Sequence, residues 1–107
     1  MTEEIIKLLD EIIEDRKFSS SERSYVKSLL DSGDPKMIKK VREETEELIE
    51  ALNHNGKNPE KLIHEAADLW FHVLVMLASR DIKGLDVIEE LKKRLGTSGL
   101  VEKASRK

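Results

Sequence analysis

The chain of 107 residues contains no cysteine and has few aromatic residues, prolines or glycines. Without cysteine it can form neither a disulfide nor a thiolate metal site. No apolar stretch is long enough to span a membrane, and the acidic start Met1-Thr2-Glu3-Glu4 lacks the basic residues and apolar run of a signal peptide. We therefore expect a cytoplasmic protein, and the length predicts one domain over residues 1–107.

Charged residues are abundant but unevenly distributed. Lys and Arg number 19 against 22 Asp and Glu, a net charge of −3. Residues 92–107 carry a net +5, which leaves −8 on residues 1–91. An acidic body argues against binding to nucleic acid. The basic C-terminal end, including the tail 96–107, instead indicates a local contact with phosphate.

Apolar residues recur at helical spacing and none alternates with period two, which predicts an all-α fold of about five helices without a sheet. The short second helix is expected to begin at a capping box formed by Ser19 and Glu22. Asp34 and Asn58 each stand before a proline and are expected to cap the third and fourth helices. The expected ranges are 2–17, a short segment ending at Gly33, 35–53, 59–80 and 85–95.

The fourth expected helix is apolar almost all round between Ala66 and Ala78. A helix of that kind must be covered on every side. A monomer of five short helices offers too little cover. The sequence therefore predicts a homodimer, in which a second copy completes a helix bundle.

The third expected helix carries five glutamates in eight residues, and a charge run on a helix is most often a solvated face. A rotation of about 100° per residue along the helix divides the glutamates between two sides of it. Glu43, Glu46 and Glu50 fall on the outer face, whereas Lys40, Glu44 and Glu47 line one border of the core stripe. That stripe consists of Met37, Val41, Thr45, Leu48, Ile49 and Leu52.

The fourth expected helix presents a matching pair, Glu65 and Asp68, with His72 one turn further on. Asp68 lies among apolar residues, so we expect it to be buried and to need a partner. His72 is expected to be a core histidine with satisfied nitrogens rather than a ligand. A short turn makes the two helices antiparallel, so the carboxylate pairs face each other and repel. Mg²⁺, which prefers oxygen ligands and substrate phosphates, would offset that repulsion. A di-iron site would need Glu-x-x-His motifs on two helices, which the sequence lacks.

The constellation consists of Glu43-Glu44-Thr45-Glu46-Glu47, then seventeen residues, then Glu65-Ala66-Ala67-Asp68. It resembles the signature of the all-α, MazG-type nucleoside triphosphate pyrophosphatases. Segments 24–30, 39–44 and 65–72 and the tail 94–106 resemble, within that superfamily, the phosphoribosyl-ATP pyrophosphatases of histidine biosynthesis. Arg42, Thr45 and Glu46 depart from the family's pattern, but none of them is an expected ligand.

This resemblance implies hydrolysis of the α–β phosphoanhydride of phosphoribosyl-ATP to phosphoribosyl-AMP and pyrophosphate. It implies that Mg²⁺ is held by Glu44, Glu47, Glu65 and Asp68. Glu43 would support these ligands or act as the base. The substrate's phosphates would be contacted by Lys40, Arg94, Ser98, Lys103 and Arg106.

Two other functions stay open on the sequence alone. A house-cleaning pyrophosphatase for ordinary or damaged nucleotides would use the same metal site. A non-enzymatic helical dimerisation module would need the acidic residues only for solubility. Clustering of acids along a buried border favours an enzyme over the second alternative.

Overall fold

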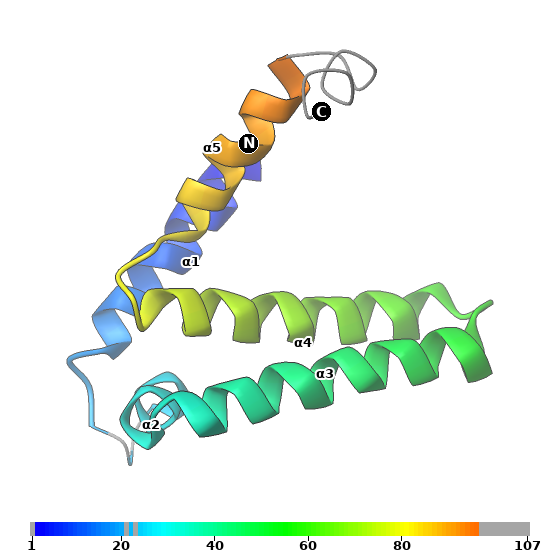
Figure 1. Ribbon diagram of the computed structural model, residues 1–107, viewed down its shortest axis with the longest axis horizontal. Helices are drawn as coiled ribbons and strands as arrows, with labels where there is room; N and C mark the ends of the chain where they lie inside the picture. Colours follow the sequence, from blue (N-terminus) through cyan, green and yellow to red (C-terminus); the bar gives the residue numbers. More distant parts are fainter. Residues whose placement is uncertain (1, 21, 23, 97–107) are drawn as a thin grey trace, which may run out of the picture.

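The computed structural model describes residues 2–20, 22 and 24–96, and within these ranges it contains five helices and no strand. The predicted all-α fold is therefore confirmed. Figure 1 shows α3 and α4 side by side as a long hairpin, with α2 beside the start of α3, while α1 and α5 form a second arm at an angle to the hairpin. None of the described helices is long and apolar enough to cross a membrane. The helices are α1 (Thr2–Arg16), α2 (Tyr25–Ser32), α3 (Asp34–Asn55), α4 (Pro59–Ala78) and α5 (Gly84–Gly96).

The start of α2 differs from the predicted one. Ser24 is the N-cap, and its hydroxyl oxygen accepts a hydrogen bond from the Lys27 amide at 3.2 Å. The predicted capping box of Ser19 and Glu22 is wrong, because Ser19 lies in the bend after α1 and the helix begins only at Tyr25. Ser24 is the cap instead, because it lies three residues before Lys27, whose amide has no partner within the helix.

The other two predicted caps have opposite outcomes. Asn58 caps α4 as predicted, since its side-chain oxygen accepts a hydrogen bond from the Lys61 amide at 3.2 Å. The predicted cap at Asp34 is wrong. Gly33, at φ 85°, precedes α3 without any side-chain cap, and Asp34 is already helical and pairs with Arg80 at the end of α4.

The core lies where α3 begins and α4 ends, and four helices contribute to it. Its buried residues are Ile13, Val26, Leu29, Met37, Val75 and Ala78. Leu29 and Val75 are the largest side chains that are completely enclosed. Because this cluster fixes one end of the α3–α4 hairpin, the remaining turns of both helices project away from it in a fixed register.

Asp10 of α1 connects the two helices of the second arm, because its side chain caps the N-terminus of α5. Its carboxylate accepts hydrogen bonds from the amides of Gly84 at 2.6 Å and Leu85 at 3.0 Å. A negative side chain at a helix N-terminus also interacts favourably with the helix dipole. A Cβ at position 84 would lie 2.6 Å from Cδ2 of Leu74, so any larger residue there would require the Leu74 side chain to move.

A large part of the apolar surface is uncovered. Trp70 on α4 is 66% exposed and Ile63 is 67% exposed. Ile49 and Leu52 of α3, which were expected in the core, are 44% and 61% exposed, so that prediction is wrong for the single chain. Trp70 also lines an apolar groove of about 410 Å³ between α1, α4 and α5. An exposed tryptophan beside an apolar groove is typical of an interaction site.

Candidate active site

The antiparallel packing of α3 and α4 gathers three carboxylates from the two helices. One ligand oxygen each of Glu44, Glu47 and Glu65 lies within 4.8 Å of the other two. Spacing of i, i+3 on α3 puts Glu44 and Glu47 on one side of that helix, and Glu65 meets them from α4. Three of the four predicted metal ligands therefore lie together.

Asp68 belongs to a second group that shares Glu65 with the first. Its carboxylate, His64 and Glu65 offer ligand atoms within 4.8 Å of one another. Asp68 Oδ2 lies 3.3 Å from His64 Nε2, and its side chain is 41% exposed. The expectation that Asp68 would be buried is therefore wrong. Its side chain turns toward His64 at the rim of the hairpin, and Glu65 takes the buried place.

Two of the carboxylates are buried without a full set of partners. Glu44 is 6% exposed and Glu65 is 4% exposed. In each, the oxygen Oε2 is enclosed and has no hydrogen-bond partner among the described residues. A buried polar atom without a partner is destabilising, and native proteins keep few of them without a functional reason. A bound cation would supply the missing interaction.

Two lysines stand beside these acids. Lys61 Nζ lies 3.0 Å from Glu65 Oε1. Lys40 Nζ lies 3.5 Å from Glu43 Oε1 and 3.6 Å from Glu44 Oε1. Both lysines keep part of their surface accessible, so each can neutralise a carboxylate and still meet an anionic ligand.

The pKa values of Glu47 and Glu65 move in opposite directions. The hydrogen bond from Lys61 lowers the pKa of Glu65, although burial of that carboxyl acts against it. The pKa of Glu47 is raised above its ordinary value of 4.5, first because its protonated form can share a hydrogen bond with the neighbouring Glu65 carboxylate and then because Glu44 is negatively charged. Of the two, Glu47 is thus the residue that takes up a proton first, and a cation at the site would compete with that proton.

A polar pocket opens beside the cluster. It has a volume of about 400 Å³ and extends from the carboxylates toward the turn between α3 and α4. This leaves room for a polar ligand next to Glu47 and Glu65. The lining residues are Glu47, Glu50, Ala51, His54, Lys61 and Glu65.

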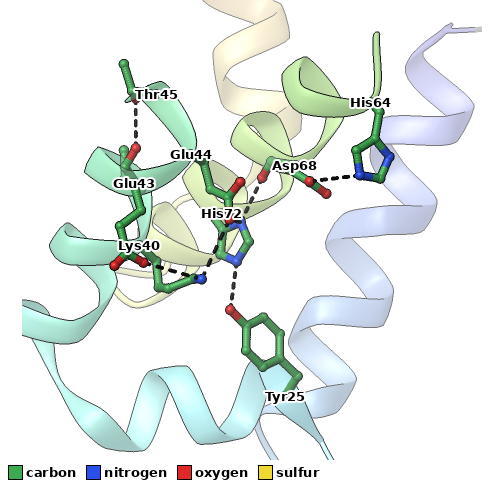
Figure 2. Close-up of polar contacts among 9 residues, drawn as sticks. Tyr25, Lys40, Glu43, Glu44, Thr45, His64, Asp68 and His72 are labelled. Atoms are coloured by element: carbon green, nitrogen blue, oxygen red, sulfur yellow. Dashed lines mark hydrogen bonds and ion pairs between the residues drawn. The ribbon is translucent and has the colours of Figure 1, made fainter. Parts of the chain in front are cut away.

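On the other side of Glu44, His72 is buried and bonded through both ring nitrogens (Figure 2). Nδ1 lies 2.7 Å from the Asp68 carbonyl oxygen and Nε2 lies 2.8 Å from the Tyr25 hydroxyl. The prediction of a satisfied core histidine is confirmed. Tyr25 itself is 51% exposed.

The predicted substrate contacts are dispersed. Lys40 and Glu43 lie directly beside Glu44, as Figure 2 shows. Arg94 lies near the end of α5, where its Nε is 3.5 Å from Glu90 Oε2, and α5 packs mainly on α1 rather than on α3. The other three, Ser98, Lys103 and Arg106, lie outside the described residues.

Sequence reasoning missed three neighbours of the site. The pairs of Lys61 with Glu65 and of His64 with Asp68 have i, i+4 spacing, so a search for helical ion pairs would have found them. The contact of Tyr25 with His72 joins residues 47 positions apart. No local pattern in a single sequence reports such a contact.

Comparison with known proteins assigns this chain to a family. The family model of phosphoribosyl-ATP pyrophosphohydrolase matches residues 6–95. The phosphoribosyl-ATP pyrophosphatase of Neisseria meningitidis serogroup B is 43% identical over 106 residues, covering 99% of this chain and 97% of that protein. That of Vesicomyosocius okutanii is 45% identical over 104 residues, covering 97% of each chain. The chain belongs to the phosphoribosyl-ATP pyrophosphohydrolase family, as the sequence resemblance predicted.

Proposed function

We propose that this chain is a Mg²⁺-dependent enzyme that hydrolyses the α–β phosphoanhydride of phosphoribosyl-ATP to phosphoribosyl-AMP and pyrophosphate, the second step of histidine biosynthesis. The observation that carries the proposal is the convergence of Glu44, Glu47 and Glu65 in a member of this family. The relatives at 43% to 45% identity bear the name of this activity.

The donor set fits a hard divalent cation. All the converging groups are carboxylates or a histidine, and two of the buried oxygens have no partner among the described residues. Mg²⁺ takes oxygen ligands of this kind. Glu44, Glu47 and Glu65 would hold the ion. Asp68, whose carboxylate lies close to Glu65, would be a fourth ligand. The chemistry that Mg²⁺ supplies when bound is neutralisation of phosphate charge and a lower pKa for a coordinated water.

The chain's own residues bind and orient the triphosphate. Lys40 is our choice for a phosphate contact, because its ammonium lies at the edge of the cluster and part of its side chain remains accessible. Glu43, 3.5 Å from Lys40, would hold that lysine in place or accept a proton from the attacking water. Arg94, Ser98, Lys103 and Arg106 remain proposed contacts for the substrate's outer phosphates.

We further propose that the enzyme is a homodimer. The α3–α4 hairpin exposes apolar side chains on both helices, and one of them, Trp70, lines an apolar groove; the others are Ile63, Leu52 and Ile49. A second copy is the occupant we infer, because the face belongs to the same two helices that carry the carboxylates and each copy would cover the other's exposed residues. Obligate homodimer interfaces resemble a domain core cut in half.

The decisive assay is pyrophosphate release from phosphoribosyl-ATP with Mg²⁺, with and without EDTA. We expect turnover only when Mg²⁺ is free, and much slower release from dATP and dUTP. Comparable rates on all three substrates would instead indicate a house-cleaning pyrophosphatase. Absence of pyrophosphate from every substrate would support a dimerisation module without activity.

A matched pair of variants tests the site. Glu44→Gln should abolish turnover, whereas Glu46→Gln, at an exposed position two residues further along α3, should leave it unchanged. Equal activity in both variants would contradict the proposed ligand set.

A further inference from the structure

His72 of α4 lies between Tyr25 of α2 and Glu44 of α3 (Figure 2). Its Nδ1 is 2.7 Å from the Asp68 carbonyl oxygen, which can only accept, so Nδ1 carries the hydrogen. In the neutral ring Nε2 then has the lone pair, and the Tyr25 hydroxyl at 2.8 Å donates to it. The two partners together select one tautomer.

The same contacts fix the orientation of the imidazole. A half-turn of the ring would exchange both nitrogens for carbons and break both hydrogen bonds at once. The rings of Tyr25 and Phe71 pack against it edge to face, with centroids at 5.7 Å and 5.4 Å. His72 is only 8% exposed, so water offers little replacement for a lost partner. The ring is therefore held rigidly from two sides.

Glu44 packs against the Nδ1 edge of that ring without a hydrogen bond to it, because the Nδ1 hydrogen is donated to the Asp68 carbonyl. Its Oε1 lies 4.0 Å from His72 Nδ1 and 3.6 Å from Lys40 Nζ, whereas its Oε2 has no hydrogen-bond partner in the described part of the chain. One carboxylate oxygen thus faces two nitrogen groups and the other is left for a ligand. Neighbours of this kind orient metal ligands and tune their affinity.

We propose that Tyr25 and His72 are positioning residues, which hold the Glu44 carboxylate in its metal-binding orientation without contacting substrate or metal. The proposal rests on the proposed function, because it takes Glu44 to be a ligand of Mg²⁺. The hydroxyl of a half-exposed tyrosine on α2 thereby supports a carboxylate on α3 through a ring on α4.

The test is binding of Mn²⁺, a hard cation standing in for Mg²⁺, followed by electron paramagnetic resonance without substrate. Tyr25→Phe and His72→Leu should each weaken Mn²⁺ binding about 10-fold. His72→Asn should regain most of the affinity, because an asparagine amide can donate to the Asp68 carbonyl from nearly the position of Nδ1 and so keep a side chain packed against Glu44. Ser32→Ala removes a different side-chain hydrogen bond of α2, from Ser32 Oγ to the Ser28 carbonyl, and should change nothing.

Two controls accompany these variants: a check that each one folds, and the Mn²⁺ affinity of Glu44→Gln. If His72→Leu does not fold, Tyr25→Phe alone decides, because its side chain is half exposed and only an oxygen is lost. Unchanged Mn²⁺ affinity in folded Tyr25→Phe and His72→Leu, beside lost affinity in Glu44→Gln, would overturn the positioning role alone. Unchanged affinity in Glu44→Gln as well would overturn the proposed metal site.

Discussion

Replacing Glu44 by glutamine removes one charge from the carboxylate cluster and keeps the shape of the side chain. In the metal-free protein the amide oxygen would face Lys40 and His72, where Oε1 now lies. The amide NH₂ would take the place of Oε2, which has no hydrogen-bond partner among the residues described, in a cluster that also contains the carboxylates of Glu47 and Glu65. A buried acceptor without a partner thus becomes a donor with acceptors nearby. We expect Glu44→Gln to stabilise the metal-free protein by about 1 kcal/mol.

That change is measurable as a melting temperature. A chain of 107 residues has an unfolding entropy of about 0.22 kcal/mol/K near its midpoint, so 1 kcal/mol corresponds to about 4 to 5 °C. Mg²⁺ should reverse the order of the two proteins. At a concentration of about 100 times its Kd, Mg²⁺ stabilises the wild-type protein by about 2.7 kcal/mol, or about 12 °C, whereas the variant gains little.

The assay is thermal unfolding at one protein concentration, in EDTA and in excess Mg²⁺, with Glu46→Gln as the control. Glu46 is exposed on the same helix, so its variant should stay within about 0.5 kcal/mol of the wild type in both buffers. A Glu44→Gln protein that melts below the wild type in EDTA would refute the reasoning about the unpartnered oxygen. A wild-type protein that ignores Mg²⁺ would refute the reasoning about the cation.

Three further predictions address the pH dependence, the fold and the assembly. Because the pKa of Glu47 is raised, its protonation should stabilise the metal-free fold as the pH falls toward 4.5. In the same pH range Mg²⁺ binding should release that proton, which calorimetry detects as a binding enthalpy that differs between two buffers. Asp10→Ala removes the cap of α5 and should cost about 1 to 2 kcal/mol in urea unfolding, whereas Asp10→Asn, which keeps an acceptor, should cost less; equal losses would contradict the capping role. Trp70→Glu should shift sedimentation from dimer to monomer, whereas Phe18→Glu, at an even more exposed aromatic residue in the turn after α1, should not. A dimer in both variants would exclude Trp70 from the interface.

The helices could be predicted from sequence because their signals are local. Asn58 before a proline sets the start of α4, and apolar spacing sets the length of each helix. The errors also have local causes. Ser19 and Ser24 both suit an N-cap, and only the tertiary position of α2 decides between them. Asp34 had a competing partner, Arg80, which is 46 residues away in sequence.

The sequence predicts which residues form the site, but it does not predict which of them are buried. Spacing of i, i+3 predicts which side of each helix Glu44, Glu47, Glu65 and Asp68 share. It does not predict how deeply α3 and α4 pack at each turn. The structure buries Glu44 and Glu65 and leaves Glu47 and Asp68 near the surface, because the packed side of α3 runs through Glu44 and Ala51 rather than through Ile49.

Exposed apolar and buried polar residues violate the usual packing rules in two places, and each violation has its own explanation. On the hairpin, Trp70 and Leu52 are exposed among the described residues, and the proposed second copy would cover them. Between the helices, Glu44 and Glu65 are buried, and Oε2 of each has no hydrogen-bond partner within the part of the chain that the structure describes. Local sequence rules fail at functional sites for this reason, since residues there are selected for a ligand that the isolated fold does not contain.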